Sequence, residues 1–441
     1  MRTKLVFYWA KLSGSYWFIP SLMLISAVVL AAVMINLDTS PQGEWQDVWW
    51  IYTGGPDGAR TLLSTVAGSM ISAATLAFSI TMVVLTLASS QFGPRLLNNF
   101  LRDRGNQIVL GTFIATFMYC LLILRTVRGE DHAIFVPHLS VTVAVVLTIA
   151  NLGVLVYFIH HVSTSIRAES IIARIGDDLD NAIDRLRPDG DSVQPWERRL
   201  REGDDIPADF EAEAFTLASE RSGYVQAIDA DSLMKIAKEH NLVLQVQGRK
   251  GHFIGRGADL VKIWSEEALS DELKNQINQG FIVDIHRLQR QDIEFAIDQL
   301  VEIAARALSP GVNDPFTAMA CVDQLGVALA RLAEKQVPPA YRYDDAGQLR
   351  LIFQPLTFTT LTNRAFDQIR QYARTNTAVT IRLLETIAVI VAQANDEEER
   401  QVLLNQAKMI NQGGQEALPE RSDRNEVHRS YQMIQTLVMS Y

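Results

Sequence analysis

The sequence is poor in cysteine and in charge. Cys120 and Cys321 are its only cysteines in 441 residues, and they lie in no CxxC or Cys/His cluster. They cannot form a disulfide framework, and no structural zinc site is expected. Only 20% of the residues are charged and 48% are apolar, which is less charge than the quarter or so of a soluble protein. A net charge of −10 argues against a protein that binds nucleic acid by phosphate attraction.

Charge is also unevenly distributed along the chain. Residues 1–165 carry nine Lys and Arg against seven Asp and Glu, whereas the remainder carries 31 against 43. The first part is apolar and the second part is acidic. The sequence therefore indicates an integral membrane protein, in contact with lipid, that carries a large soluble domain.

Four stretches of the first part contain no formally charged residue. Crossing a hydrocarbon core of about 30 Å takes roughly 20 apolar helical residues. Each stretch is expected to be a helix, because backbone groups in lipid must be hydrogen-bonded within the segment. The stretches are residues 17–37, 61–94, 105–124 and 139–159. We predict four transmembrane helices within a domain of residues 1–165.

Basic residues near the ends of these spans indicate their orientation. Cytoplasmic loops carry an excess of Lys and Arg. Six basic residues lie on the side of the N-terminus: Arg2, Lys4, Lys11, Arg95, Arg102 and Arg104. Three lie on the other side: Arg60, Arg125 and Arg128. Both termini are therefore expected in the cytoplasm.

The second span is longer than a membrane requires. Its 34 uncharged residues would reach about 51 Å as a helix. Ser and Thr recur along it at helical spacing, and two aliphatic residues interrupt them on the same face. We call this set the polar ridge; it consists of Thr65, Ser69, Ser72, Leu76, Ser79, Val83, Thr86 and Ser90.

Two interpretations of the polar ridge are open. It could line a water-filled pore, with Leu76 and Val83 as a hydrophobic constriction. Alternatively, small and hydroxyl side chains let membrane helices pack closely. No Asp, Glu, Lys or Arg lies inside a predicted span, which argues against a proton-coupled or ion-coupled pump but not against a passive pore.

Residues 166–211 are predicted to be a juxtamembrane helix followed by a charged linker. Apolar residues recur there with coiled-coil-like spacing at Ile172, Ile175, Leu179, Ile183 and Leu186. This face either packs on its own domain or mediates self-association near the membrane.

Residues 212–265 are predicted to form a small β-rich subdomain. Short strand-like runs alternate with turn glycines, and a helix is expected from 231 to 240. Residues 222–260 resemble the barrel-sandwich pattern of biotinyl and lipoyl domains. Lys250 lies in a turn but lacks the flanking residues of the modified lysine in those families, so we expect no cofactor.

Residues 266–441 are predicted to form a mainly helical cytoplasmic domain. Helices are expected at 271–279, 291–308, 315–335, 361–395, 398–410 and 424–440, with a β-hairpin at 341–351. The fold class is thus four transmembrane helices plus a mixed α/β soluble domain.

A cluster of charged residues surrounds the start of two of these helices. A ligand-binding or gating region could contain His286, Arg290, Asp292 and Asp314. In a structural interpretation, Asp292 lies near a helix start, Asp314 caps the next helix, and Arg287 or Arg290 pairs with acids. We expect no metal site and no catalytic residue, because the sequence has no GxSxG, HExxH or P-loop motif.

Two segments resemble the signatures of a known family. They are residues 90–97, SQFGPRLL, and residues 306–318, RALSPGVNDPFTA. They are similar to those of the predicted bacterial membrane proteins catalogued as domain of unknown function 2254. The resemblance covers nearly the whole chain and implies a bacterial inner-membrane location with this layout. It supplies no activity, substrate or catalytic residue.

Two classes of function are left, and an enzyme is the least supported class. The first is a homo-oligomeric, channel-like protein that passes ions or small solutes through a pore lined by the second span. The second is a membrane-anchored regulatory or scaffold protein whose cytoplasmic domain binds a partner or ligand.

Overall fold

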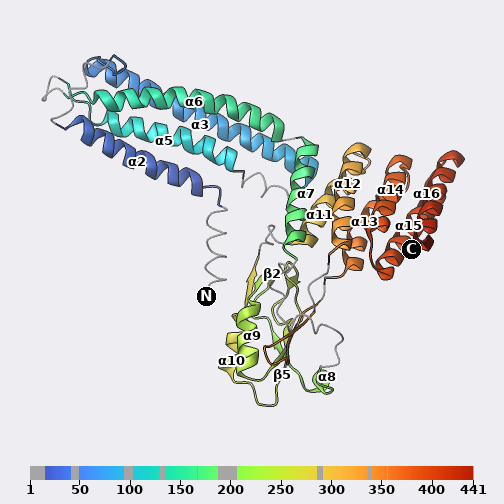
Figure 1. Cartoon of the computed structure of the whole chain (residues 1–441). Coiled ribbons are helices and arrows are strands. Elements are labelled where there is room, and N and C mark those ends of the chain that lie inside the picture. Colours follow the sequence, from blue (N-terminus) through green and yellow to red (C-terminus); the bar gives the residue numbers. More distant parts are fainter. Residues whose placement is uncertain are drawn as a thin grey trace. The chain divides into compact units, whose positions relative to one another are not determined.

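The computed structural model describes residues 15–40, 49–93, 103–129, 135–165, 167–186, 206–285, 292–335, 340–354 and 356–440. The chain folds into two compact units, Met1–Ser170 and Ile171–Tyr441. We call them the N-terminal unit and the C-terminal unit. Figure 1 shows the helices of the first and the sheets and helices of the second.

The N-terminal unit contains a helix at each of the four predicted apolar runs. They are α2 (Phe18–Asp38), α3 (Pro56–Phe92), α5 (Arg104–Leu124) and α6 (His138–Ser165). α5 contacts each of the other three helices. Gly111 lets α5 approach α2 closely, since a Cβ atom there would lie 3.2 Å from the Pro20 Cα atom. Close approach through small residues is the usual way in which membrane helices pack.

Acidic side chains connect the ends of these helices. At the end of α2, the Asp38 carboxylate accepts hydrogen bonds from the backbone amides of Leu139 (3.0 Å) and Ser140 (2.9 Å) at the start of α6. Before α5, Asp103 caps that helix through the amide of Gly105 and also lies 3.0 Å from His161 Nε2 near the end of α6. Both ends of α6 are thus held by a carboxylate from another segment.

The first part of the C-terminal unit contains two small sheets. The five-stranded sheet has the order β1-β5-β3-β8-β7, and the three-stranded sheet has the order β4-β2-β6. The strands are β1 (Phe215–Ala218), β2 (Gly223–Ile228), β3 (Val243–Val246), β4 (Phe253–Ile254), β5 (Asp259–Trp264), β6 (Phe281–Asp284), β7 (Tyr341–Tyr343) and β8 (Leu349–Ile352). Three short helices accompany them: α8 (Phe210–Glu213), α9 (Ala230–Glu239) and α10 (Asp271–Asn278).

The sheets combine strands from both sides of residue 265. β3 pairs in parallel with β8, and β2 pairs antiparallel with β6. Their shared core buries Leu233, Leu244, Val261 and Leu351. The hairpin of β7 and β8 therefore completes the larger sheet although about 80 residues separate it from β5.

The rest of the C-terminal unit is a stack of helical hairpins. The helices are α11 (Ile293–Ala307), α12 (Pro315–Ala333), α13 (Phe358–Tyr372), α14 (Thr377–Gln393), α15 (Glu397–Ala417) and α16 (Arg421–Ser440). α12, α14 and α16 follow one another in one layer, and α11, α13 and α15 do so in the other. Figure 1 shows this succession of helices. Stacks of this kind occur in helical repeat proteins.

The predicted helix at 361–395 is in fact two helices. α13 ends at Tyr372, and Asn376 caps α14 by accepting a hydrogen bond from the Val379 amide (3.1 Å). The continuous apolar pattern of the sequence concealed this break. The break allows α14 to return beside α13 as the second helix of a hairpin.

The count of apolar helices also needs correction. Among the described residues, five helices, not four, are long and apolar enough to cross a membrane. The fifth is α12, which is buried to 56% within the protein, more than any of the other four. Its apolar side chains pack against α11 and α14. Hydropathy alone does not distinguish a buried helix from a membrane span.

The face predicted to pack or to self-associate lies on α7 (Ala168–Asp184) and packs within the chain. Ile172, Ile175, Leu179 and Ile183 are all buried. On the neighbouring turn, Asp180 lies 2.8 Å from Arg331 of α12. The apolar face is thus covered without a second copy.

Candidate functional site

The polar ridge lies on the outward face of α3. All eight of its residues are exposed in the single chain. Leu76 is 56% exposed and Val83 is 60% exposed, so the two aliphatic positions point outward with the hydroxyl residues. The ridge runs over about seven helical turns.

A different face of α3 packs inside the unit. It is lined by small residues and Leu63, and Ala59, Leu63 and Ala67 share a core with Tyr119 and Cys120 of α5. Alanine, rather than serine or threonine, therefore allows α3 to approach its neighbours. The alternative that the ridge itself packs helices within one chain has no support in this arrangement.

The hydroxyl groups of the ridge donate to their own helix. Ser72 Oγ donates to the Gly68 carbonyl oxygen and Ser79 Oγ to that of Thr75, each at 2.8 Å. Thr65, Ser69, Thr86 and Ser90 form equivalent bonds. Each donor is satisfied, and each oxygen keeps lone pairs that can accept from water or coordinate a cation.

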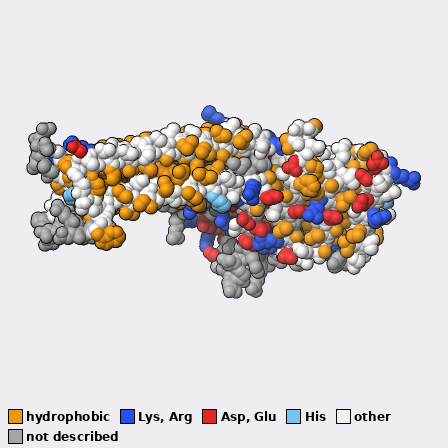
Figure 2. Space-filling view, turned by 90° about the horizontal axis from the view of Figure 1, so that it is seen from above, with side chains coloured by type: hydrophobic (Ala, Val, Ile, Leu, Met, Phe, Trp, Pro, Cys, Tyr) orange, Lys and Arg blue, Asp and Glu red, His pale blue; other side chains and the backbone are white. Residues whose placement is uncertain are grey.

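The outward faces of α2 and α6 are more aliphatic than the polar ridge, while α3 also exposes Ile71 (41%), Phe78 (36%), Met82 (41%) and Leu87 (47%) beside the ridge. α2 exposes Val29 (57%), and α6 exposes Val146 (57%), Ile149 (67%) and Leu152 (65%). Figure 2 shows apolar side chains spread along the visible face of this unit, with very few charges. These aliphatic faces suit contact with lipid chains. A row of hydroxyl groups does not need contact with lipid chains.

A shallow groove lies at the N-terminal end of α3. It has a volume of about 530 Å³ and is lined by Asp57, Gly58, Thr61, Leu62, Thr65 and Val66. Thr65 is the first residue of the polar ridge, so the groove continues the ridge toward Asp57. The Asp57 carboxylate at this end lies 3.8 Å from Arg60.

The second predicted region is only partly described. His286 and Arg290 lie outside the described residues. Asp292 caps α11 by accepting from the Phe295 amide (3.2 Å), and Asp314 caps α12 through the Thr317 amide (3.1 Å) and hydroxyl (2.6 Å). Both carboxylates thus have the structural role that the sequence offered as one interpretation. Among the described residues, no group of three or more His, Cys, Asp and Glu could hold a metal ion.

Sequence analysis missed a buried ion cluster beside these caps. The Glu294 side chain is 4% exposed and lies 3.0 Å from His252 Nε2, 3.4 Å from Arg364 and 3.7 Å from Arg249. Arg364 also binds Asp298 through two hydrogen bonds of 2.5 and 2.9 Å. In the sequence, the only signal of this cluster is that Glu294 lies beside the apolar face of its helix. The other members cannot be recognised as its partners, because they are 42 to 70 residues away along the chain.

Opposing effects set the ionisation of Glu294. Burial raises the pKa of this carboxyl group. The hydrogen bond from His252 and the charges of Arg364 and Arg249 outweigh burial, so the pKa lies below its ordinary value. The carboxylate therefore stays charged inside the protein and joins α11 to the loop before β4.

The turn between α11 and α12 carries the longer signature segment. Asn313 has a φ angle of 50°, a left-handed conformation that asparagine tolerates better than most residues. On either side, Val312 is 52% exposed and Phe316 is 80% exposed. Two apolar side chains are thus exposed on either side of the Asp314 cap, Val312 in the turn and Phe316 in the first turn of α12.

Fold and surface together define a class of protein. It is a membrane protein in which an apolar helical unit precedes a mixed α/β unit that ends in stacked helices. The family model described as "Predicted membrane protein (DUF2254)" matches residues 13–389. The chain belongs to this family, as the two signature segments indicated.

The chain is also similar to mycobacterial proteins. An uncharacterized protein of Mycobacterium tuberculosis (strain H37Rv) is 30% identical over 418 residues, which cover 94% of this chain and 78% of the relative. An uncharacterized protein of Mycobacterium bovis matches with the same identity and coverage. No solved structure matches the chain.

Proposed function

We propose that the protein is a channel-like homo-oligomer that passes ions or small solutes passively, with copies of α3 around the axis. One observation carries this proposal: the polar ridge is exposed along α3, while the neighbouring outward faces are aliphatic. An oligomer built around α3 would turn the ridge toward a shared axis and leave α2 and α6 in contact with lipid.

The chemistry of the ridge suits passive conduction. Hydroxyl oxygens offer weak, repeated coordination to a passing cation, which favours entry without tight binding. Leu76 and Val83 would form apolar rings that could close the pore by excluding water. The ridge contains no ionisable residue, as expected for a pore rather than for a coupled pump.

The proposal includes a membrane topology. We propose that α2, α3, α5 and α6 cross a bacterial inner membrane, with both termini in the cytoplasm. α12 stays outside the membrane, since its Asp323 pairs with Arg382 of α14 at 2.7 Å. The acidic C-terminal unit would lie on the cytoplasmic side and raise the local concentration of cations.

Cysteine labelling of the ridge tests the proposal. The Ser72→Cys variant in liposomes is expected to lose more than about 90% of its cation flux after treatment with a charged, water-soluble thiol reagent. The native Cys120 and Cys321 are buried and should not react. Flux is measured by an ion-sensitive dye inside the vesicles, before and after labelling.

Val146→Cys is the matched control for Ser72→Cys. Val146 is 57% exposed on α6 but would face lipid, so a charged reagent should neither label it nor change the flux. Absence of flux through the unlabelled protein at any voltage, membrane tension and pH would refute conduction. Absence of labelling at Ser72→Cys would place the ridge outside any aqueous path.

The second candidate function is a membrane-anchored scaffold or regulator. The exposed side chains of Val312 and Phe316 favour this function. The stacked helices of the C-terminal unit also favour it, since such stacks present extended binding surfaces. Aromatic side chains commonly anchor protein interfaces. An enzyme stays the least supported class, because no catalytic motif is present in the sequence.

Phe316→Ser tests the second candidate. If Phe316 anchors a partner, the variant should lose at least about tenfold in partner binding with its folding intact, because truncated anchor residues cost about 2 kcal/mol or more. The measurement is quantitative co-purification of cross-linked proteins from cells. Val327→Ser, at a site 51% exposed along α12, is the control. Identical partner profiles for both variants would count against a binding role of the turn.

A further inference from the structure

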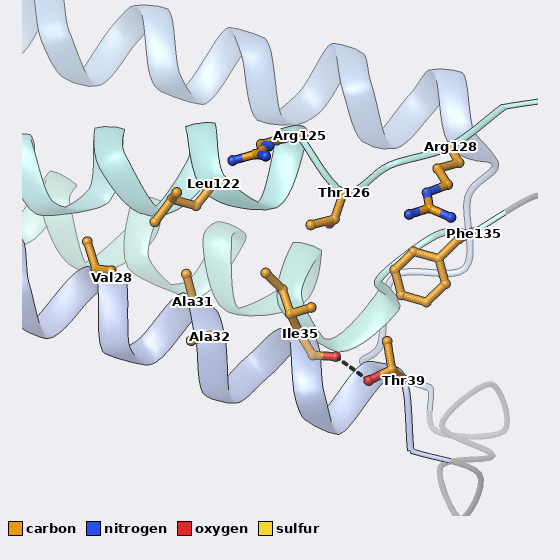
Figure 3. Close-up of a pocket in the computed structure, with 10 residues that line it drawn as sticks. All are labelled: Val28, Ala31, Ala32, Ile35, Thr39, Leu122, Arg125, Thr126, Arg128 and Phe135. Carbon is orange, nitrogen blue, oxygen red and sulfur yellow. Dashed lines mark hydrogen bonds between the residues drawn. The ribbon is translucent and has the colours of Figure 1, made fainter.

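The N-terminal unit has a groove between the ends of α2 and α5. It has a volume of about 680 Å³, which is in the range of small-molecule sites. Figure 3 shows Val28, Ala31, Ala32 and Ile35 on α2 along one side and Leu122, Arg125 and Thr126 on the other. Phe135 and Arg128 lie at the end of the groove near Thr39.

The groove has mainly apolar walls, with Arg125 on one wall beside Leu122 and Arg128 at its end. The small side chains of Ala31 and Ala32 leave the space, and Val28, Ile35 and Leu122 provide aliphatic walls. Arg125 follows directly after the last residue of α5, and Arg128 lies three residues further on. Among the residues that the structure describes, no acidic side chain forms an ion pair with either arginine.

The backbone of Arg128 is paired with that of Phe135. Arg128 and Phe135 form a reciprocal pair of hydrogen bonds, with the Arg128 amide donating at 3.0 Å and the Phe135 amide at 3.3 Å. This bridge holds a cation and an aromatic ring at the end of the groove. In the proposed topology, that level is the boundary between hydrocarbon and headgroups, because α5 has just ended.

We propose that this groove binds an anionic phospholipid. The phosphate would lie at Arg128, and one acyl chain would run along α2 past Ile35 and Ala32 toward Val28. The guanidinium group of Arg128 provides the paired donors that a phosphate accepts. Arg125, which Figure 3 shows beside Leu122, adds a second positive charge on the wall of the groove. A free anion would use the basic end but not the apolar length. The inference does not depend on conduction by the polar ridge.

Lipid retention by the purified full-length protein tests the inference. After exchange into detergent with equal phosphatidylglycerol and phosphatidylcholine, native mass spectrometry should show preferential retention of phosphatidylglycerol. The double variant Arg125→Gln/Arg128→Gln is expected to weaken that retention about thirtyfold, because each cation near a headgroup contributes about a factor of five. Both arginines are exposed, so the variant should fold normally.

The apolar length is tested separately. Ala32→Phe should fill the groove and weaken phosphatidylglycerol retention about tenfold, as expected if about two methylene groups lose their contact. The control for Ala32→Phe is Val33→Phe, at the adjacent exposed position outside the groove. The control for the double arginine variant is Arg104→Gln, at the other end of α5. Neither control should change retention.

Three outcomes would overturn the inference. One is equal retention of both lipids by the native protein. Another is loss of retention in Arg104→Gln as large as in the double variant, which would indicate a general charge effect. The third is full competition by inorganic phosphate with no effect of Ala32→Phe, which would indicate a free-anion site.

Discussion

Replacing Glu294 with Gln is expected to destabilise the C-terminal unit by about 4 kcal/mol. Removing one partner of a buried ion cluster leaves the others without compensation, which costs about 3–5 kcal/mol. Glu294 is 4% exposed and is surrounded by His252, Arg249 and Arg364. A glutamine of the same shape keeps the packing but cannot neutralise those groups.

The same residue predicts a dependence of stability on pH. The pKa of Glu294 in the folded protein lies below its ordinary value because of His252, Arg364 and Arg249, which outweigh burial. Its stabilising contribution is therefore complete above the ordinary carboxyl pKa of about 4.3 and is lost as the pH falls through the lower, folded value. Glu294→Gln should remove this part of the acid sensitivity.

Denaturant unfolding of the full-length protein in detergent, followed by circular dichroism, measures both effects. The free energy of unfolding is compared at pH 7 and at several values below about pH 4. Glu266→Gln, at an exposed site on the loop after β5, is the matched control. If Glu294→Gln unfolds at the same denaturant concentration as Glu266→Gln, the ion cluster contributes nothing to stability.

Replacing Asp38 with Ala is expected to destabilise the N-terminal unit by about 3 kcal/mol. Asp38 accepts hydrogen bonds from the Leu139 and Ser140 amides and from the Ser140 hydroxyl (2.5 Å). Hydrogen bonds to a charged group contribute about 1.5–3 kcal/mol each, and a carboxylate also interacts favourably with a helix N-terminus. These hydrogen bonds are partly exposed, so we place the total loss of stability at the low end of what that range allows.

Thermal unfolding in detergent, followed by the solubility of the heated protein, measures the effect of Asp38→Ala. Asp38→Asn should lose less, because its amide oxygen still accepts one of the bonds. Asp57→Ala is the control, since the Asp57 side chain is 99% exposed and forms only a long 3.8 Å contact with Arg60. A midpoint for Asp38→Ala equal to that of Asp57→Ala would show that α6 does not need this cap.

Sequence reasoning succeeded where the determinants are local. Each charge-free run became a helix, because length and apolarity are read directly along the chain. The cap at Asp314 and the position of Asp292 near a helix start were among the interpretations offered, because a capping residue lies within three positions of its target amides. Of the five strands between residues 212 and 265, β1 to β4 were predicted from turn glycines and short apolar runs, whereas β5 was not predicted.

Sequence reasoning failed where the interacting residues are distant from one another along the chain. The break at Asn376 lies inside one apolar pattern, and the parallel pairing of β3 with β8 joins segments about 100 residues apart. The apolar character of α12 resembles that of a membrane span, yet the structure buries it among other helices. Hydropathy counts apolar side chains but does not identify what covers them.

The polar ridge shows the same difference between local properties and contacts that are distant in the sequence. The sequence alone determined that Ser, Thr, Leu76 and Val83 share one face of a long uncharged helix, because a period of 3.6 residues is a local property. Only the tertiary structure decided that this face points outward, because alanines on the opposite face provide the closer fit to α5 and α6. Which side of a helix packs depends on the shape of its neighbours, and those neighbours are distant in the sequence.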